Sequence, residues 1–359
     1  MKRQVSIALL LAALAAAACT HIGPQMIPRD RFDYSTAIAD SWKRQTLLNV
    51  VKLRYLDLPI FVDVGQIVSG YSLVTSLGAI GSLSDEALVP PGNSLALSGQ
   101  ARFEDRPTIT YTPLTGSRFV RGLMTPLPPD SVFFTIQSGW AADAVLSVAA
   151  TSLNGLKNQT VSAAGVAPAD AGFQRALELL RKIQLSGAVG MRVVQDADKR
   201  QTSLVTFRTK DISQETLDQI AELRQLLHLD PEAQELKLVY SAVPADDKEL
   251  AVLTNSMLHI MMALSACVDV PAADVEQGRA TPGQESLGEA ERTSSFRVRC
   301  AAERPSDDAF AAVEYRKLWF WIDDRDIRSK RALALLMLLF TLTDTGEPES
   351  LPLITIPAQ

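Results

Sequence analysis

The order of helical and extended patterns along the chain is the feature that most limits how it can fold. Between residues 170 and 241, apolar residues recur at helical spacing, then in two alternating stretches, then at helical spacing, and finally in alternation. Residues 246–356 show the same order, and residues 35–153 show it with additional extended segments. Apolar stripes and faces of this kind must be buried against each other. The sequence therefore predicts an α+β protein of two or three small α-β-β-α-β modules, with helices packed on one face of short mixed sheets.

Polar stretches between these patterns set the expected domain boundaries. We predict an N-terminal α+β module over residues 34–158, a middle module over 168–243 and a C-terminal module over 245–359. A short echo supports the repeat, because Lys210-Asp211-Ile212 and Arg325-Asp326-Ile327 both stand between a second strand and a second helix. The additional segments of the first module leave open whether it belongs to the repeat.

The C-terminal module contains the most apolar part of the chain. We expect a helix over residues 246–264, strands at 296–300 and 315–322, a helix over 332–340 and a final strand at 351–356. The second helix is too short to cross a membrane and lies between strands, so we assign it to the core. The two tryptophans of the second strand share one face, which we expect to be buried.

The N-terminal module is harder to assign. Residues 77–93 are rich in Gly, Ser and Pro and predict a loop. Residues 102–104 and 108–111 alternate between polar and apolar types and are typical of two paired strands. Residues 144–153 are small and apolar, and we expect a further strand there.

The N-terminus has the features of a bacterial secretion signal. Lys2 and Arg3 precede an apolar run that extends from Ile7 to Ala18 and ends at Cys19. This ending resembles the lipobox of bacterial lipoproteins, in which the cysteine becomes the N-terminus and carries the lipid, although Ala16 stands where leucine is commoner. We therefore predict a lipoprotein signal peptide over residues 1–18 and lipidation of Cys19. The alternative is cleavage by ordinary signal peptidase after an Ala-x-Ala sequence.

The residues after the signal indicate where such a lipoprotein is retained. Thr20 follows the cysteine, whereas aspartate at this position resembles a signal for retention in the inner membrane. Residues 19–33 are polar and contain Gly23 and Pro24, which favours a tether between the lipid and the first module. We expect a protein anchored to the periplasmic face of the outer membrane.

Charge and cysteine content narrow the function classes. Removal of Lys2 and Arg3 with the signal changes the net charge from −6 to about −8, which argues against a nucleic-acid partner. Cys267 and Cys300 remain, and in an oxidising periplasm they are candidates for a disulfide bond. Two buried thiols are the alternative.

No residue pattern indicates a reaction. His21, His228 and His259 are far apart and do not match the spacing of a metal site, and we find no nucleophile elbow, phosphate-binding loop or dinucleotide fingerprint. The richest acidic stretch is residues 323–326, but basic residues alternate with its acids, which predicts a salt-bridged turn and a helix cap. We therefore expect no enzyme, no cofactor and no bound metal.

Three stretches resemble a group of predicted lipoproteins of unknown function from proteobacteria. They are Leu47–Tyr55, Thr110–Gly116 and Trp319–Asp324. The resemblance implies a location in the cell envelope and brings no activity, cofactor or catalytic residue. The order of elements also resembles the ring-building modules of envelope-spanning bacterial assemblies, although element order alone does not carry function.

The expected location in the cell envelope and the expected modular architecture together favour a non-catalytic role. The first hypothesis is a lipid-anchored periplasmic scaffold or interaction subunit of a cell-envelope assembly, with envelope proteins or further copies of itself as partners. The alternative is a lipoprotein that binds peptidoglycan or a small envelope ligand.

Overall fold

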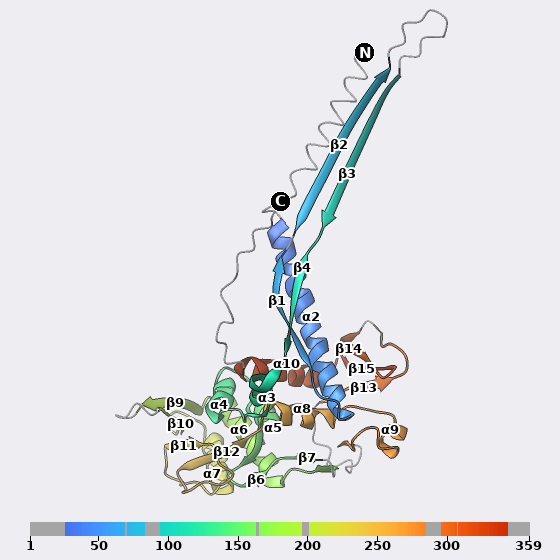
Figure 1. Cartoon of the computed structure of the whole chain (residues 1–359). Helices are drawn as coiled ribbons and strands as arrows, with labels where there is room; N and C mark the ends of the chain where they lie inside the picture. Colours follow the sequence, from blue (N-terminus) through green and yellow to red (C-terminus); the bar gives the residue numbers. More distant parts are fainter. Residues whose placement is uncertain are drawn as a thin grey trace, which may run out of the picture. The chain divides into compact units, whose positions relative to one another are not determined.

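The protein is an α+β chain that divides into two compact units (Figure 1). The computed structural model describes residues 26–68, 70–82, 94–162, 165–195, 201–284, 296–306 and 308–343. One unit comprises Met1–Ala39 with Val62–Leu114, and the other comprises Asp40–Phe61 with Thr115–Gln359. The predicted signal peptide, Cys19 and the predicted strand at 351–356 lie outside the described residues.

Helix α2 (Met26–Arg54) contributes to both units. The predicted tether over residues 19–33 is wrong from Met26 onward, because these residues already belong to α2. In this first part of the helix, Arg29 and Asp33 are four positions apart and form an ion pair at 3.6 Å between side-chain N and O atoms. The second part of α2 buries Leu47, Val50 and Val51 completely.

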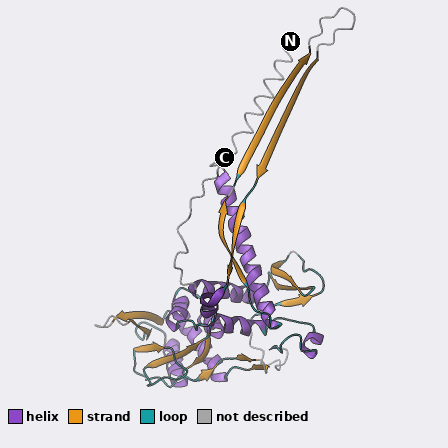
Figure 2. Cartoon of the chain, in the orientation of Figure 1, coloured by secondary structure: helices purple, strands orange, loops and turns teal. Residues whose placement is uncertain are grey.

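The smaller unit contains two separate pairs of antiparallel strands, drawn as orange arrows in Figure 2. Strand β2 (Tyr71–Ser82) pairs with β3 (Ser94–Asp105) in continuous register from Tyr71↔Asp105 to Ser82↔Ser94. Strands β1 (Phe61–Val68) and β4 (Thr108–Leu114) form the other pair.

Two predictions for this unit are wrong. Residues 77–82 continue β2 and are not a loop, whereas residues 83–93 lie outside the described part of the chain. Residues 102–104 and 108–111 belong to different pairs, because β3 pairs with β2 and β4 with β1. Arg106 lies between β3 and β4, where the chain passes from one strand pair to the other. It donates its backbone N–H to the carbonyl of Gly70.

The larger unit contains a mixed sheet of six strands in the order β6-β5-β12-β11-β10-β9. Strands β11 and β12 are parallel, and the other neighbours are antiparallel. The strands are β5 (Ala150–Leu153), β6 (Leu156–Lys157), β9 (Val189–Gln195), β10 (Gln201–Phe207), β11 (Glu235–Val239) and β12 (Glu249–Thr254). Two short strands, β7 (Thr160–Ser162) and β8 (Gly165–Ala167), follow β6 in the sequence and pair with each other.

The middle part of the chain has the predicted order of elements. Helix α6 (Ala171–Leu185) is followed by β9 and β10, helix α7 (Gln214–Leu226) and β11. Phe173, Leu180 and Ile183 form the buried stripe of α6, and Ser213 caps α7 by accepting a hydrogen bond from the N–H of Thr216. The sheet does not divide at the predicted module boundaries, however, because β5 and β12 complete it from the other two modules.

The predicted helix at the start of the last module is wrong, because strand β12 occupies its first part. Residues 249–254 form a strand and not the start of a helix, and helix α8 (Met257–Ser265) begins only after Ser256. Leu250, Ala251 and Val252 are all buried, since β12 lies inside the sheet with both faces covered. A strand of this kind loses its alternation and resembles a buried helix in sequence.

The predicted strand at 144–153 is also only partly correct. Helix α5 (Ala142–Ala149) occupies most of this stretch, and only Ala150–Leu153 is extended. Two helices precede it, α3 (Gly116–Met124) and α4 (Pro129–Gln137). The prolines of residues 112–129 predicted mostly loop where α3 forms, whereas Asp130-Ser131 predicted the helix that α4 confirms. Helices α3, α5, α8 and α10 pack against one another, and α4 and α6 contact strands of the sheet.

The chain continues with helix α9 (Ala272–Glu276), a three-stranded antiparallel sheet and helix α10 (Ile327–Thr343). The sheet has the order β13-β15-β14, with β13 (Arg299–Ala301), β14 (Ala309–Tyr315) and β15 (Leu318–Asp323). In β15 the buried face carries Phe320 and Ile322, whereas Trp319 and Trp321 are half-buried, so the prediction for the tryptophan face is wrong. No helix of the described residues has both the length and the apolar composition needed to cross a membrane.

Candidate interaction site

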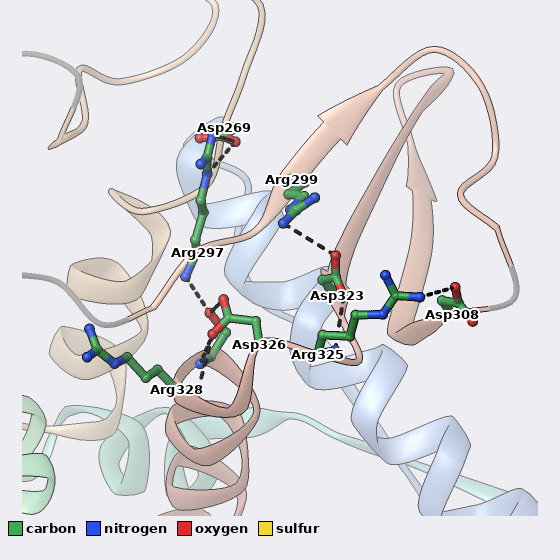
Figure 3. Close-up of polar contacts among 9 residues, drawn as sticks. Asp269, Arg297, Arg299, Asp308, Asp323, Arg325, Asp326 and Arg328 are labelled. Atoms are coloured by element: carbon green, nitrogen blue, oxygen red, sulfur yellow. Dashed lines mark hydrogen bonds and ion pairs between the residues drawn. The ribbon is translucent and has the colours of Figure 1, made fainter.

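The acidic stretch at residues 323–326 directly precedes helix α10 (Figure 3). Asp326 accepts hydrogen bonds from the backbone N–H groups of Arg328 and Ser329 at 3.2 and 3.1 Å, and from the Ser329 hydroxyl at 2.6 Å. Burial opposes ionisation of Asp326, but these hydrogen bonds outweigh it and hold its pKa below the usual value. The carboxylate is thus a helix cap, as the sequence predicted.

The other acids of this region are paired with arginine or lysine, and Figure 3 shows three of the four pairs. The distances between side-chain N and O atoms are 3.3 Å for Arg299–Asp323, 3.2 Å for Arg325–Asp308, 2.9 Å for Arg297–Asp269 and 2.7 Å for Lys330–Asp324. Nowhere in the described ranges do three or more His, Cys, Asp or Glu residues form a group that could hold a metal ion. The interpretation of a salt-bridged turn is confirmed.

The two cysteines lie on neighbouring segments but out of register. Val268 and Val298 form a parallel bridge, so Cys267 and Cys300 are offset by three positions, or roughly 10 Å along the segments. A disulfide bond requires Cα atoms within about 7 Å, and both residues are thiols in this structure. Burial raises the pKa of Cys300 to about 11, with Asp269 and Asp274 adding to the effect.

The histidines have structural surroundings where they are described. His228 ends α7 in a left-handed conformation with φ of 54°. His259 lies in the first turn of α8, and burial lowers its pKa. His21 lies outside the described residues.

A different group of polar residues joins the end of α2 to the turn between β14 and β15. We call it the Arg316 cluster, and it consists of Tyr55, Asp57, Asp274, Tyr315 and Arg316. The hydroxyl of Tyr55 donates to Asp274 at 3.1 Å, and the hydroxyl of Tyr315 donates to Asp57. Arg316 forms an ion pair with the same Asp57 at 3.3 Å.

Aromatic contacts hold the Arg316 cluster together. The guanidinium of Arg316 lies 4.6 Å from the ring centre of Tyr55 and 5.6 Å from that of Tyr315. The two tyrosine rings meet edge to face at 5.6 Å, and Tyr55 has a second edge contact with the buried Phe320 at 6.4 Å. Burial raises the pKa of Tyr55, and the hydrogen bond to Asp274 adds to this, so the hydroxyl stays protonated and acts as a donor.

The backbone of this turn is strained. Arg316 and Lys317 form the two-residue loop between Tyr315 and Leu318, and their φ angles are 51° and 65°. Two-residue hairpin loops with two positive φ angles favour Asn-Gly, because other L-residues are disfavoured there by about 1–2 kcal/mol each. Strain of this kind is concentrated at functional sites. The turn could not be recognised from the sequence, because Arg316 and Lys317 are neither glycine, asparagine nor proline.

Exposed apolar side chains lie next to the Arg316 cluster in the chain. Leu56 and Leu58 flank Asp57 and are 72% and 79% exposed. Their segment is fixed in place, because the buried Asn49 donates to the carbonyl of Ile60 at 2.8 Å and accepts from its N–H at 3.0 Å. The structure thus presents two leucines to solvent on a rigid segment beside an arginine stacked on tyrosines.

A pocket of about 440 Å³ lies at helix α7 and the segment after it. Leu217, Ile220 and Leu229 contribute apolar walls, and Arg224 contributes a cation. The guanidinium of Arg224 donates to the backbone carbonyls of Pro231 and Ala233, and burial lowers its pKa. Two of the five N–H donors of this arginine are thus used by backbone carbonyls, whereas its buried Nε has no hydrogen-bond partner among the described residues.

No family model matches the chain, and neither a curated protein nor a solved structure matches it.

Proposed function

We propose that the protein is a non-catalytic, lipid-anchored interaction subunit of a cell-envelope assembly, held by Cys19 on the periplasmic face of the outer membrane. The observation that carries this proposal is the exposure of Leu56 and Leu58 on a rigid segment beside the Arg316 cluster. The resemblance to predicted lipoproteins adds support for the envelope address.

The chemistry of the cluster favours protein contacts over catalysis. Interface hot spots are enriched in tyrosine and arginine and are surrounded by apolar contacts that exclude water. The Arg316 cluster has this composition, and its donors and acceptors are already matched within the chain. A partner that covers Leu56 and Leu58 also excludes water from the Asp57–Arg316 ion pair, which strengthens it.

Site-specific crosslinking in intact cells tests this proposal. A photoreactive amino acid at position 58 should give a discrete crosslinked band, and the same amino acid at position 185 should not. Leu185 is the matched control because it is 70% exposed at the end of α6, in the same unit. The band should disappear when Arg316→Glu is added, since this change reverses the charge opposite Asp57. Equal crosslinking at both positions contradicts the proposal.

The anchor is tested separately. A Cys19→Ser variant should lose acylation and appear in the soluble periplasmic fraction. If that variant is still acylated and membrane-bound, the assignment of Cys19 is wrong.

The pocket at α7 supports the second candidate function, a lipoprotein that binds peptidoglycan or a small envelope ligand. Its volume of about 440 Å³ falls within the usual range for ligand sites. The Cys19→Ser protein can be tested with soluble peptidoglycan fragments by calorimetry. Ala221 also lines the pocket, so the Ala221→Trp change should block it. A strict monomer that binds such fragments, and loses them on this change, favours the second candidate over the first.

A further inference from the structure

Strand β9 forms an open edge of the six-stranded sheet (Figure 1). Among the described residues it pairs only with β10, in continuous register over seven residue pairs. Soluble proteins protect edge strands with charges, prolines or bulges that prevent pairing with another chain. Strand β9 contains no proline, and its pairing with β10 contains no bulge. Its one charged residue, Arg192, forms an ion pair with Glu235 at 2.5 Å. The edge is therefore open to a further strand.

The hydrogen-bond pattern shows which backbone groups of β9 point away from β10. One residue before the strand, the carbonyl of Ala188 accepts from the N–H of Arg208 at 2.7 Å. The N–H of Phe207, opposite Val189, instead donates to the carbonyl of Gln234 at 3.3 Å, on the β11 side of β10. Bonded and non-bonded pairs alternate along an antiparallel ladder, so the odd-numbered positions of β9 direct their N–H and C=O groups outward.

These outward groups are accessible in the second half of β9. The carbonyl of Met191 accepts a hydrogen bond from the exposed side chain of Gln137 at 3.4 Å, which is long for such a bond. Val193 is the next outward position, and its N–H and C=O groups have no partner in the part of the chain that the structure describes. The side chains of Val193 and Val194 are 54% and 40% exposed. The edge thus offers backbone donors and acceptors together with apolar side chains.

A cleft of about 250 Å³ lies beside the first half of β9. Its apolar walls come from Phe133 and Ile136 of α4 and from Val189 and Met191 of the strand. Side chains two positions apart share a face of the sheet, so Val193 continues the face of Val189 and Met191. A strand added beside β9 places alternate side chains on this same face. The residue opposite Met191 then directs its side chain into the cleft.

We propose that the β9 edge binds an extended peptide segment of a partner protein, which pairs antiparallel with the strand and inserts one apolar side chain into the cleft. In this mode of recognition the backbone hydrogen bonds supply affinity, and the pocket for a side chain supplies specificity. Antiparallel pairing is slightly more stable per residue than parallel pairing. The inference goes beyond the proposed function, because it concerns a second surface and needs neither the Arg316 cluster nor the anchor at Cys19.

The charge and register of the edge identify an apolar peptide as the occupant. None of the residues that line the cleft is charged, and the charge of Arg192 is neutralised by Glu235, so the site complements an uncharged segment. A second copy of β9 matches the cleft poorly. Antiparallel pairing that centres Val193 on its own copy places the polar Gln195 opposite Met191, beside the apolar walls.

Binding of a defined peptide by the purified Cys19→Ser protein tests the proposal. The probe is Thr-Val-Thr-Leu-Thr-Val-Thr with a lysine tail and a fluorophore, and binding is measured by fluorescence anisotropy. In antiparallel pairing with leucine opposite Met191, the N–H groups of the leucine and both valines face β9. N-methylation of both valines should therefore weaken binding roughly 30-fold or more. N-methylation of the two central threonines is the matched control and should leave binding within about threefold.

Substitution at one position of β9 tests the same hydrogen bonds from the side of the protein. Val193→Pro removes an outward N–H and leaves the bonds to β10 in place, because proline is tolerated on an edge where its nitrogen faces solvent. It should weaken peptide binding roughly tenfold or more. Val193→Thr keeps the N–H and the branched shape and should stay within about threefold of the parent. Circular dichroism and thermal melts verify that both variants are folded.

The outcomes separate this proposal from the proposed function. Arg316→Glu should leave peptide binding unchanged, so this test and the crosslinking test at position 58 can fail independently. Leu185 precedes β9 and does not line the cleft, so it stays a valid control for that crosslinking. The proposal is overturned if the peptide does not bind, or if both N-methylated peptides lose binding equally. A dimer in sedimentation analysis that Val193→Pro dissociates also overturns it, since that result assigns the edge to a second copy.

Discussion

The β14–β15 turn allows the strain of the Arg316 cluster to be separated from its contacts. Lys317 and Arg316 are both left-handed, but only Arg316 has an ion pair and a ring contact in the structure. Glycine at either position removes a backbone cost of about 1–2 kcal/mol. The larger conformational entropy of glycine in the unfolded chain opposes this stabilisation by about 0.5–1 kcal/mol. Lys317→Gly should therefore stabilise the protein by roughly 0.5–1 kcal/mol.

Arg316→Gly gains the same backbone relief but loses two contacts. The ion pair with Asp57 is about half-exposed on both sides, which limits its value to about 0.2–1 kcal/mol. Stacking on Tyr55 contributes a further 0.5–1 kcal/mol or so. The net effect should lie between no change and a loss of about 1 kcal/mol, so the two glycine variants should differ by roughly 1 kcal/mol.

Urea unfolding of the two variants, followed by fluorescence and repeated as a thermal melt, measures this difference. About 1 kcal/mol corresponds to roughly 2–4 °C in Tm for a unit of this size. Lys317→Gly should unfold at higher urea and higher temperature than the parent, and Arg316→Gly should not. Equal stabilisation by both changes refutes the idea that Arg316 contacts stabilise the cluster. Destabilisation by Lys317→Gly refutes the assignment of strain to this turn.

Three further predictions concern residues outside the turn. Asp326→Ala should cost about 1 kcal/mol, because it removes the cap of α10. The pKa of Asp326 is lowered on folding, so its stabilisation is complete above about pH 4 and is lost as the pH falls through the lowered value. Urea titrations should therefore show a smaller variant penalty at pH 3 than at pH 7. Cys267 and Cys300 should both react with a thiol reagent after unfolding without reductant, and Cys300 should react slowly in the native protein at pH 8, since its pKa of about 11 leaves little thiolate. Asn49→Ala should cost about 2 kcal/mol in urea unfolding, because it leaves both backbone groups of Ile60 without their side-chain partner.

Sequence patterns predicted the α+β class and the element order of the middle module, because its helices and strands each have one buried face. They failed where another part of the molecule decides the structure. Gly78 was assigned to a loop, yet a Cβ atom there would lie 2.6 Å from the Ser98 hydroxyl oxygen, so the neighbouring strand accounts for the glycine. The cap by Asp326 could be predicted, since it involves adjacent residues. The hydrogen bond between Tyr55 and Asp274 could not, because 219 positions separate them.

The features that oppose catalysis in the Arg316 cluster are the ones that suit it to binding. A raised pKa keeps the Tyr55 hydroxyl from acting as a base, and Asp57 is occupied by Tyr315 and Arg316. A group with matched charges and fixed rings loses little conformational entropy when a partner covers it, so more of the contact energy is retained as affinity. The turn formed by Arg316 and Lys317 has a place in this account, since its conformation positions the guanidinium over the tyrosine ring before any partner arrives. Lys317→Gly keeps this turn and the Arg316 side chain, so it should raise stability and leave crosslinking at position 58 unchanged. Loss of the Arg316 side chain should reduce that crosslinking even where stability is unaffected.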